Sequence, residues 1–149
     1  MTFNDKEYSV DEGQPFHLFD FEKGTWLRHL TTRDKEFYVS DSVIYQPASI
    51  SHGKIRKGEE VKKDSVTIRL PRGDSLSGMF LQTPPEYRTS VTIRRLHEGL
   101  DFSEAVIIWK GRVVSAEPDG QILNLVCESF LTALRKQGLR YRCELICQH

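Results

Sequence analysis

The chain has 149 residues, of which 38% are hydrophobic and 28% charged, and its 21 basic and 21 acidic side chains give a formal net charge of zero. This balance argues against a general binder of polyanions, because such binding needs a surplus of Lys and Arg on at least one face. The length suits one ordinary domain with a substantial core. We find neither an apolar run near the roughly 20 residues of a membrane span nor the pattern of a signal peptide, so we expect a protein made and folded in a cytosol.

The first third of the chain alternates apolar and polar residues with a period of two, which predicts half-buried antiparallel strands. Residues 16–21 and 26–30 flank the turn residues Lys23-Gly24 and are expected to form a hairpin. Residues 36–47 contain two further short strands around Ser40-Asp41-Ser42, whose side chains favour a turn. Residues 48–55 continue toward the next segment.

Residues 54–63 carry seven charges and are expected to form an exposed loop or a polar hairpin tip. The strand predicted over 65–70 points Val66, Ile68 and Leu70 to one face. Asp74 then caps a predicted short helix that continues through Leu81.

Two longer strands are predicted over 90–96 and 104–115, with a bulge or bend at Lys110-Gly111. The turn signal Pro118-Asp119-Gly120 precedes a returning strand over 122–127, so 104–128 reads as a hairpin. Cys127, Phe130, Leu131 and Leu134 follow helical spacing, which predicts a second short helix capped by Ser129 and ended by Gly138.

These elements predict one mainly β (α+β) domain, with an antiparallel tube-like or barrel-like sheet and two short helices. The sheet edges of such a fold must be managed, either by closing a barrel or by pairing with neighbours.

Motifs that would identify an enzyme are absent from the sequence: we find no nucleophile elbow, phosphate-binding loop, paired-His zinc helix or dinucleotide fingerprint. The five histidines are scattered. The acidic residues Asp34, Asp41, Asp74 and Asp119 are each explained by a turn or a helix cap. We therefore assign no catalytic residue and expect a protein that is not an enzyme.

The C-terminal residues offer the one cluster of soft ligands. Cys143, Cys147 and His149 lie within seven residues, and thiolates with imidazole suit zinc or an iron–sulfur centre. A closed site needs four ligands, and Cys127 could be the fourth, although its apolar surroundings favour a buried core thiol. Three cysteines do not suggest a disulfide framework, so free thiols or a small metal-binding module with a redox or regulatory role are the alternatives.

The aromatic residues have two interpretations. They could form a stacking platform for single-stranded nucleic acid on a barrel, but their spread over many strands favours a core. The basic residues Lys54, Arg56, Lys57, Lys62 and Lys63 are interleaved with acidic ones and favour a solvated loop. The aromatic set is Phe16, Phe19, Phe21, Trp26, Phe37, Tyr38, Tyr45, Phe80, Tyr87, Phe102 and Trp109.

The order of several segments after residue 14 resembles a tail-tip hub family of long-tailed bacteriophages and gene transfer agents, which is related to the lambda tail tip protein L. The most specific segments are 66–74 with Leu76, 109–113 and 125–139. The segments that carry the resemblance are PFHLFDFEKGTW, LTTRDKEF, IYQPASI, VTIRLPRGDSLSGMFL, PPEYRTSVTI, VIIWKGRVVSAEPDGQILNLVCESFLTALRKQGL and RCELICQH.

The resemblance implies a structural protein of the virion tail tip, assembled in the host cytoplasm. It implies an N-terminal arm over 1–14, a β-rich hub domain over 15–138 and the start of a cysteine-containing region over 139–149. Its partners would be copies of itself in a ring, a trimer, together with the distal tail protein and the central fibre protein. Relatives continue into further cysteines implicated in an iron–sulfur cluster, and Cys147-Gln148-His149 matches the start of that region. We therefore expect the gene to continue beyond residue 149, with a cluster bound only in the longer product.

Overall fold

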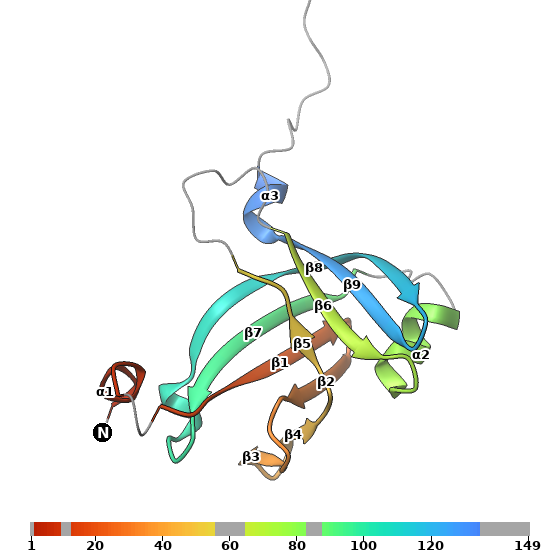
Figure 1. Ribbon diagram of the computed structural model, residues 1–149. Coiled ribbons are helices and arrows are strands. Elements are labelled where there is room, and N and C mark those ends of the chain that lie inside the picture. Colours follow the sequence, from red (N-terminus) through yellow and green to blue (C-terminus); the bar gives the residue numbers. More distant parts are fainter. Residues whose placement is uncertain (1, 10–12, 56–64, 83–87, 135–149) are drawn as a thin grey trace, which may run out of the picture.

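A computed structural model describes residues 2–9, 13–55, 65–82 and 88–134 of the chain. These residues form one nine-stranded mixed sheet, in the order β3-β4-β2-β1-β7-β8-β9-β6-β5, with three short α-helices (Figure 1). The prediction of a mainly β fold is confirmed. Both predicted helices are present, and a third lies at the N-terminus.

The elements have the following bounds. The strands are β1 Pro15–Lys23, β2 Trp26–Thr31, β3 Phe37–Ser40, β4 Val43–Pro47, β5 Ser51–His52, β6 Ser65–Pro71, β7 Ser90–His97, β8 Val106–Asp119 and β9 Ile122–Ser129. The helices are α1 Phe3–Glu7, α2 Ser75–Gln82 and α3 Phe130–Leu134, with a 3-10 turn at Phe102–Glu104.

The predicted hairpins are confirmed. Strands β1 and β2 pair antiparallel around a turn in which Gly24 has φ +60°, a conformation that glycine adopts without steric cost. Strands β8 and β9 pair down to Asp119 and Ile122, and Gly120 in the turn has φ +59°. Pro118 and Asp119 are thus still in β8, and the turn itself consists of Gly120 and Gln121, two residues after the start of the Pro-Asp-Gly signal.

The sheet departs from a purely antiparallel tube in two ways. Strands β2 and β4 pair in parallel, at Leu30 with Gln46 and Thr31 with Pro47, because the β3–β4 hairpin folds back beside β2. The described strands also do not close into a barrel, since β3 and β5 stand at opposite ends of the sheet order. The sheet is instead strongly curled, and β5 lies near β1 across its inner face, where the rings of His52 and His17 are 4.6 Å apart.

Strand β8 is bent by two register shifts. Trp109 pairs with Ile93 whereas Ile107 pairs with Arg94, so Ile108 is an extra residue, and a second extra residue is Val114. The predicted bulge at Lys110-Gly111 is therefore displaced, because both of these residues keep regular partners on β7.

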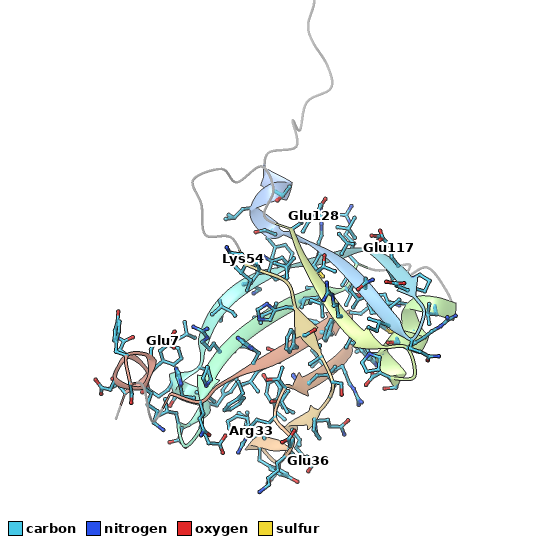
Figure 2. All side chains as sticks on the ribbon, viewed as in Figure 1. Glu7, Arg33, Glu36, Lys54, Glu117 and Glu128 are labelled. Atoms are coloured by element: carbon cyan, nitrogen blue, oxygen red, sulfur yellow. The ribbon has the colours of Figure 1, made fainter. Side chains whose placement is uncertain are left out.

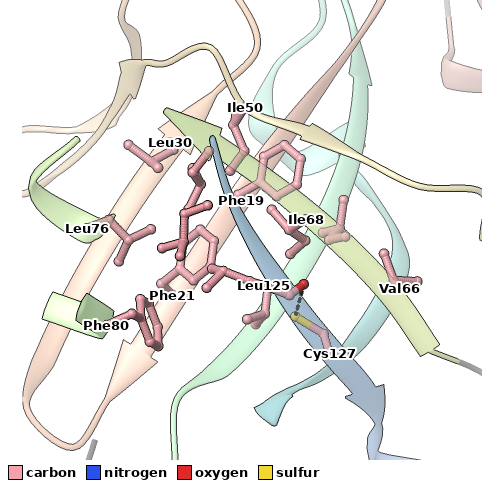
Figure 3. Close-up of a cluster of buried hydrophobic side chains, with 14 of the residues drawn as sticks. Phe19, Phe21, Leu30, Ile50, Val66, Ile68, Leu76, Phe80, Leu125 and Cys127 are labelled. Atoms are coloured by element: carbon pink, nitrogen blue, oxygen red, sulfur yellow. Dashed lines mark hydrogen bonds between the residues drawn. The ribbon is translucent and has the colours of Figure 1, made fainter. Parts of the chain in front are cut away.

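The main core fills the inner face of the curled sheet (Figure 3). Val66, Ile68 and Leu70 of β6 all point into it, as their alternation predicts. Helix α2 covers one end with Leu76 and begins where the Asp74 carboxylate accepts a hydrogen bond from the Leu76 amide at 2.8 Å. Burying these apolar side chains supplies the principal drive to fold.

The C-terminal helix α3 is described over Phe130–Leu134. The Ser129 hydroxyl accepts a hydrogen bond from the Leu131 amide at 3.3 Å, which confirms the predicted cap. Cys127 belongs to β9 rather than to the helix, because it pairs with Val66 of β6. The predicted helix end at Gly138 lies outside the described residues, and so do residues 56–63 of the charged segment.

A smaller apolar cluster lies on the outer face of the sheet. It joins Phe16 and Leu18 of β1 to Tyr45 of β4 and Leu96 of β7, with Phe102 packed against it. The β3–β4 hairpin is thus fixed against the outside of the sheet, and it brings a set of polar side chains together beside this cluster.

Candidate functional site

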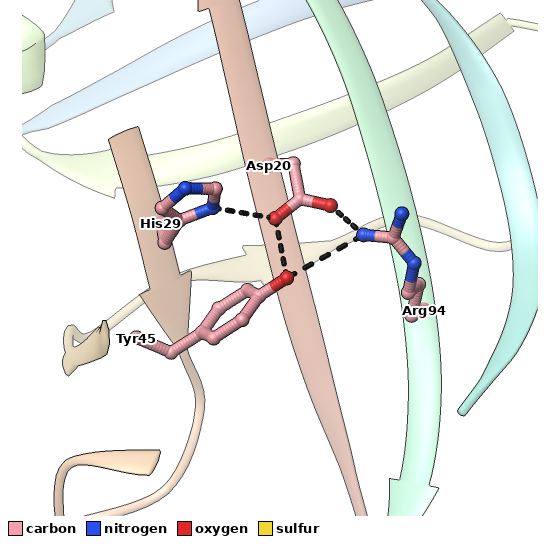
Figure 4. A network of polar contacts seen from close by, with 4 residues as sticks. All are labelled: Asp20, His29, Tyr45 and Arg94. Atoms are coloured by element: carbon pink, nitrogen blue, oxygen red, sulfur yellow. Dashed lines mark hydrogen bonds and ion pairs between the residues drawn. The ribbon is translucent and has the colours of Figure 1, made fainter. Parts of the chain in front are cut away.

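The densest polar network of the described residues centres on Asp20 (Figure 4). Asp20 follows Phe16 and Leu18 on the outer face of β1, and His29 stands directly opposite it on β2. Tyr45 comes from β4 and Arg94 from β7, so four strands contribute one side chain each.

Both oxygens of the Asp20 carboxylate are occupied. Oδ1 accepts hydrogen bonds from Nδ1 of His29 at 2.8 Å and from the Tyr45 hydroxyl at 2.6 Å. Oδ2 forms an ion pair with the Arg94 guanidinium. Because a carboxylate only accepts, Nδ1 of His29 carries a proton and a neutral ring is the Nδ1–H tautomer.

Burial sets the electrostatics of this network. It raises the pKa of Tyr45 to about 12 and lowers the pKa of both His29 and Arg94 from their ordinary values. Tyr45 is therefore a neutral donor at physiological pH. The Arg94 guanidinium also lies 5.3 Å from the centre of the Phe102 ring, which adds a cation–π contact.

This arrangement fastens strands rather than performing chemistry. The Asp20 side chain is 14% exposed and has its lone pairs engaged, and Tyr45 is 1% exposed, so neither group is free to transfer a proton to a bound molecule. The network instead ties the β3–β4 hairpin and β2 to β1 and β7. No pattern in the sequence predicted this network, although Asp20 does interrupt the apolar series of Phe16 and Leu18 on one face of β1.

A second polar cluster holds the N-terminal helix α1 against the end of β7. The Glu7 carboxylate contacts Nε2 of His97 at 2.7 Å and pairs with the Arg95 guanidinium. The ring of Phe3 packs edge-on against His97 at 4.9 Å. The helix buries none of its own residues, but His97 is only 2% exposed beneath it.

Two surface depressions, of about 390 and 330 Å³, lie on either side of the segment 32–34 that follows β2. Both are lined by Arg33, whose guanidinium pairs with Glu98 and lies 5.1 Å from the centre of the Phe16 ring. The Arg33 cation is therefore already paired and stacked, and does not reach into either depression as an unpaired charge.

The proposed metal ligands are not brought together in the described residues. Cys127 is fully buried, its thiol hydrogen-bonds weakly to the Leu125 carbonyl at 3.7 Å, and burial raises its pKa to about 12. A thiol in this environment is a core side chain, so Cys127 does not fit as a fourth ligand. Cys143, Cys147 and His149 lie outside the described residues, and within these no group of three or more His, Cys, Asp or Glu side chains could hold a metal ion.

The aromatic residues serve the core rather than a platform. Phe19, Phe21 and Tyr45 are at most 1% exposed, and Trp109 is 5% exposed. Tyr38 on β3 is the exception among the described aromatic residues of the predicted set, at 64%. Since a stacking surface needs several exposed rings side by side, the nucleic-acid interpretation finds no support here.

The free surfaces of the molecule are its sheet edges and its scattered apolar side chains. Among the described residues, β3 pairs only with β4 and β5 pairs only with β6, so each presents an open edge. Charged side chains such as Glu7, Arg33, Lys54 and Glu117 are spread over both ends of the molecule (Figure 2). The exposed large apolar side chains are Tyr8, Leu27, Tyr38, Val39, Leu81, Val106, Ile107, Val114, Ile122, Phe130 and Leu131.

Comparison with solved structures finds a similar fold in a gene transfer agent virion. A chain in the solved virion of a native gene transfer agent (GTA) particle matches this chain with a TM-score of 0.77 over 93% of its length, at 11% sequence identity. The two chains share a fold. The match covers 47% of the GTA chain, so this protein spans about half the length of that structural neighbour.

Comparisons of the sequence alone find no relative. No known protein family and no curated protein matches the sequence. Within the part of the chain that the structure describes, no helix is long and apolar enough to cross a membrane.

Proposed function

We propose that this chain is a structural, non-enzymatic component of the distal tail tip of a long-tailed bacteriophage or gene transfer agent. The observation that carries the proposal is the shared fold with a chain of the GTA virion, which extends over 93% of this chain. The sequence resemblance to tail-tip hub proteins supplies the position in the tail, between the tube or distal tail protein and the central fibre.

The open sheet supports assembly into a ring with copies of itself, a trimer. Exposed strand edges pair readily with neighbouring chains, and β3 offers such an edge with Tyr38 and Val39 exposed along it. Obligate interfaces often bury more than roughly 2,000 Å². A balanced charge suits protein partners, because acidic and basic residues can then pair across the contacts.

A metal centre, where the assembled protein has one, belongs to the C-terminal residues. Cys143, Cys147 and His149 supply ligand types that suit an iron–sulfur cluster or zinc, and further ligands would come from chain beyond residue 149. Elemental analysis and a visible spectrum of anaerobically purified full-length product test this part. If neither iron nor zinc is bound, the metal centre is ruled out, and the proposed structural role is unaffected.

The tail-tip position is tested on particles. Virions made with an epitope-tagged copy of the chain are disassembled, and the head, tube and tip fractions are compared by quantitative mass spectrometry. We expect the chain in the tip fraction, with gold-labelled antibody at the distal end of the tail. Absence from particles, or recovery with heads, would overturn the proposal.

The ring is tested on the purified chain. Sedimentation equilibrium should report a trimer of the wild-type protein, whereas Tyr38→Lys with Val39→Lys should weaken association if the β3 edge is used. Leu27→Lys is the matched control, because Leu27 is similarly exposed but lies on an inner strand of the sheet order. A wild-type chain that sediments as a monomer at every concentration tested would contradict the ring.

A further inference from the structure

Two histidines face each other where the sheet edge approaches β1. His17 lies on the inner face of β1 and His52 on β5, with ring centroids 4.6 Å apart and planes at 86°. The His52 ring also lies 6.0 Å from the ring of Phe19. Four strands separate β1 from β5 in the sheet order, so these contacts join the two across the inside of the curl rather than along a ladder.

Strand β5 has little else to hold it. It forms only two residue pairs with β6, Ser51 with Arg69 and His52 with Ile68. The Gly53 amide donates to the Thr67 carbonyl at 2.8 Å just after the strand. On the side of β1, its support is the His52 contact and the side chain of Ile50, which is 4% exposed in the core.

The hydrogen bonds fix where protons sit on the pair. Nδ1 of His52 lies 2.8 Å from the Gly53 carbonyl oxygen, and since a carbonyl only accepts, this nitrogen carries the proton. A further proton on His52 must therefore enter at Nε2 and make the ring cationic. The backbone of His17 is held separately, through its amide to the Thr32 hydroxyl at 3.0 Å.

The surroundings of the pair do not offset a positive charge. Arg95 of β7 stands opposite His17 in the β1–β7 ladder and is one of the groups that disfavour its protonation. The Glu7 carboxylate of α1 contacts Arg95, and it is shared between Arg95 and His97. Lys54, two residues beyond His52, adds a cation on the β5 segment. Burial, His52 and Arg95 together lower the pKa of His17 to about 4.

We propose that the His17–His52 contact is an acid-sensitive latch, which holds β5 against β1 at neutral pH and releases it when the pair is protonated. Two cationic rings at this separation repel each other, and the partial burial of both residues limits the hydration that the charges need. The released part is β5 with the crossing segment 48–50, while β1, β7, β8, β9 and β6 keep their long ladders. The latch is a property of this fold and does not depend on the proposed function.

The test follows amide hydrogen exchange of the full-length, isotope-labelled chain between pH 7.5 and pH 5. The Ala48 amide donates to the Thr31 carbonyl at 3.0 Å and reports on the crossing segment 48–50. The Gly53 amide donates to the Thr67 carbonyl and reports on β5. After correction for intrinsic exchange, we expect both to open on the order of tenfold more often at pH 5, since the open state binds the protons that the closed state excludes. The amide of Leu125 on β9, which pairs with Ile68 of β6, serves as the internal reference.

Variants separate the latch from general acid effects. His17→Gln and His52→Asn should each remove most of the pH dependence at Ala48 and Gly53, and Asn retains a donor near the Gly53 carbonyl. His29→Asn is the matched control, because His29 lies on the outer face and should leave the dependence unchanged. Unchanged exchange at pH 5 in the wild type, or equal acceleration in both latch variants, would overturn the proposal.

Should either latch variant fail to fold, the wild-type protein still decides the question. Histidine ring shifts of the wild type, followed by NMR, should show His17 titrating well below its ordinary pKa, together with movement of the Ile50 methyl signals in the same pH range. Titration of His17 at its ordinary pKa with static Ile50 signals would contradict the latch.

Discussion

The indole of Trp109 lies against the backbone of Gly111, two residues further along β8. A Cβ atom on Gly111 would come within 2.4 Å of Cη2 of the indole and within 2.2 Å of the Glu128 carbonyl oxygen. Trp109 is 5% exposed and belongs to the main core. Glycine is therefore needed here for close approach between side chain and backbone, not for a turn, which explains the Trp-Lys-Gly segment in a regular part of the strand.

Replacing Gly111 with Ala should destabilise the protein substantially. The added methyl group must displace either the Trp109 indole or the β9 backbone, and overpacking of this kind typically costs about 1–3 kcal/mol. The midpoint of chemical denaturation, with an unchanged m-value, measures the loss. Gly78→Ala in α2 is the matched control, because nothing lies within 4 Å of its Cβ position and alanine favours a helix. Equal stability of the two variants would contradict the packing argument.

Removing the Asp20 carboxylate should cost more than removing any one of its donors. Asp20→Ala leaves the Arg94 guanidinium and the Tyr45 hydroxyl without their shared acceptor, and we expect a loss of about 2–4 kcal/mol in this partly buried site. Tyr45→Phe removes the hydrogen bond to Asp20 and the longer one, at 3.4 Å, that the hydroxyl accepts from Arg94, and should cost about 0.5–1.5 kcal/mol.

Glu128→Ala is the control for the Asp20 series, because its carboxylate lies 3.8 Å from Arg112 at a more exposed site and should matter little. Urea unfolding of the three variants gives the order. A cost for Asp20→Ala no larger than that for Glu128→Ala would show that the network does not fasten the β3–β4 hairpin.

Local patterns predicted most of the strands because their causes are local. The alternation of apolar and polar residues correctly predicted that Val66 and Ile68 lie in the core. Asp74 correctly predicted the start of α2, because its carboxylate reaches the Leu76 amide. The parallel pairing of β2 with β4 could not be predicted in this way, since it depends on where a whole hairpin docks. The Asp20 network has the same cause, because its four side chains meet only after that docking.

Other departures come from competition between two readings of the same residues. Cys127 fits both the strand period and the following helix, and pairing with Val66 decides in favour of the strand. No turn residue marks the bulges at Ile108 and Val114, so their position depends on the register of β7 and β9. Helix α1 did carry a signal, because Thr2 and Asp5 form a capping box, but contacts with β7 supply most of its anchoring.

The thiol of Cys127 should be inert in the folded protein. In a Cys143→Ser, Cys147→Ser variant it is the one remaining thiol of the three-cysteine chain, and its complete burial and raised pKa suppress the thiolate that reacts. Reaction with Ellman's reagent at pH 8 should be at least about a hundredfold slower in the native protein than in denaturant, where burial no longer raises the pKa. Rapid reaction in the native state would show that the thiol is accessible and would return Cys127 to the set of candidate ligands.

The free energy of unfolding should fall as the pH is lowered from about 6.5 toward 4. Burial lowers the pKa of His17 from 6.5 to about 4 and lowers that of His29 as well, so the unfolded chain binds more protons in this range. The contribution of these two histidines to the free energy of unfolding is therefore fully present above pH 6.5 and is lost progressively below it. The pKa of Asp5, lowered by hydrogen bonds from Thr2, adds a loss only below its ordinary value of 3.8.

Urea unfolding at several pH values measures this dependence. The His17→Gln, His29→Asn double variant should show a flatter profile between pH 6.5 and 4.5, because neither replacement titrates. Gln retains an amide in place of the His17 ring, and Asn retains a donor for the Asp20 carboxylate, so folding at pH 7.5 should be preserved. A profile as steep as that of the wild type would assign the acid sensitivity to groups other than these two histidines.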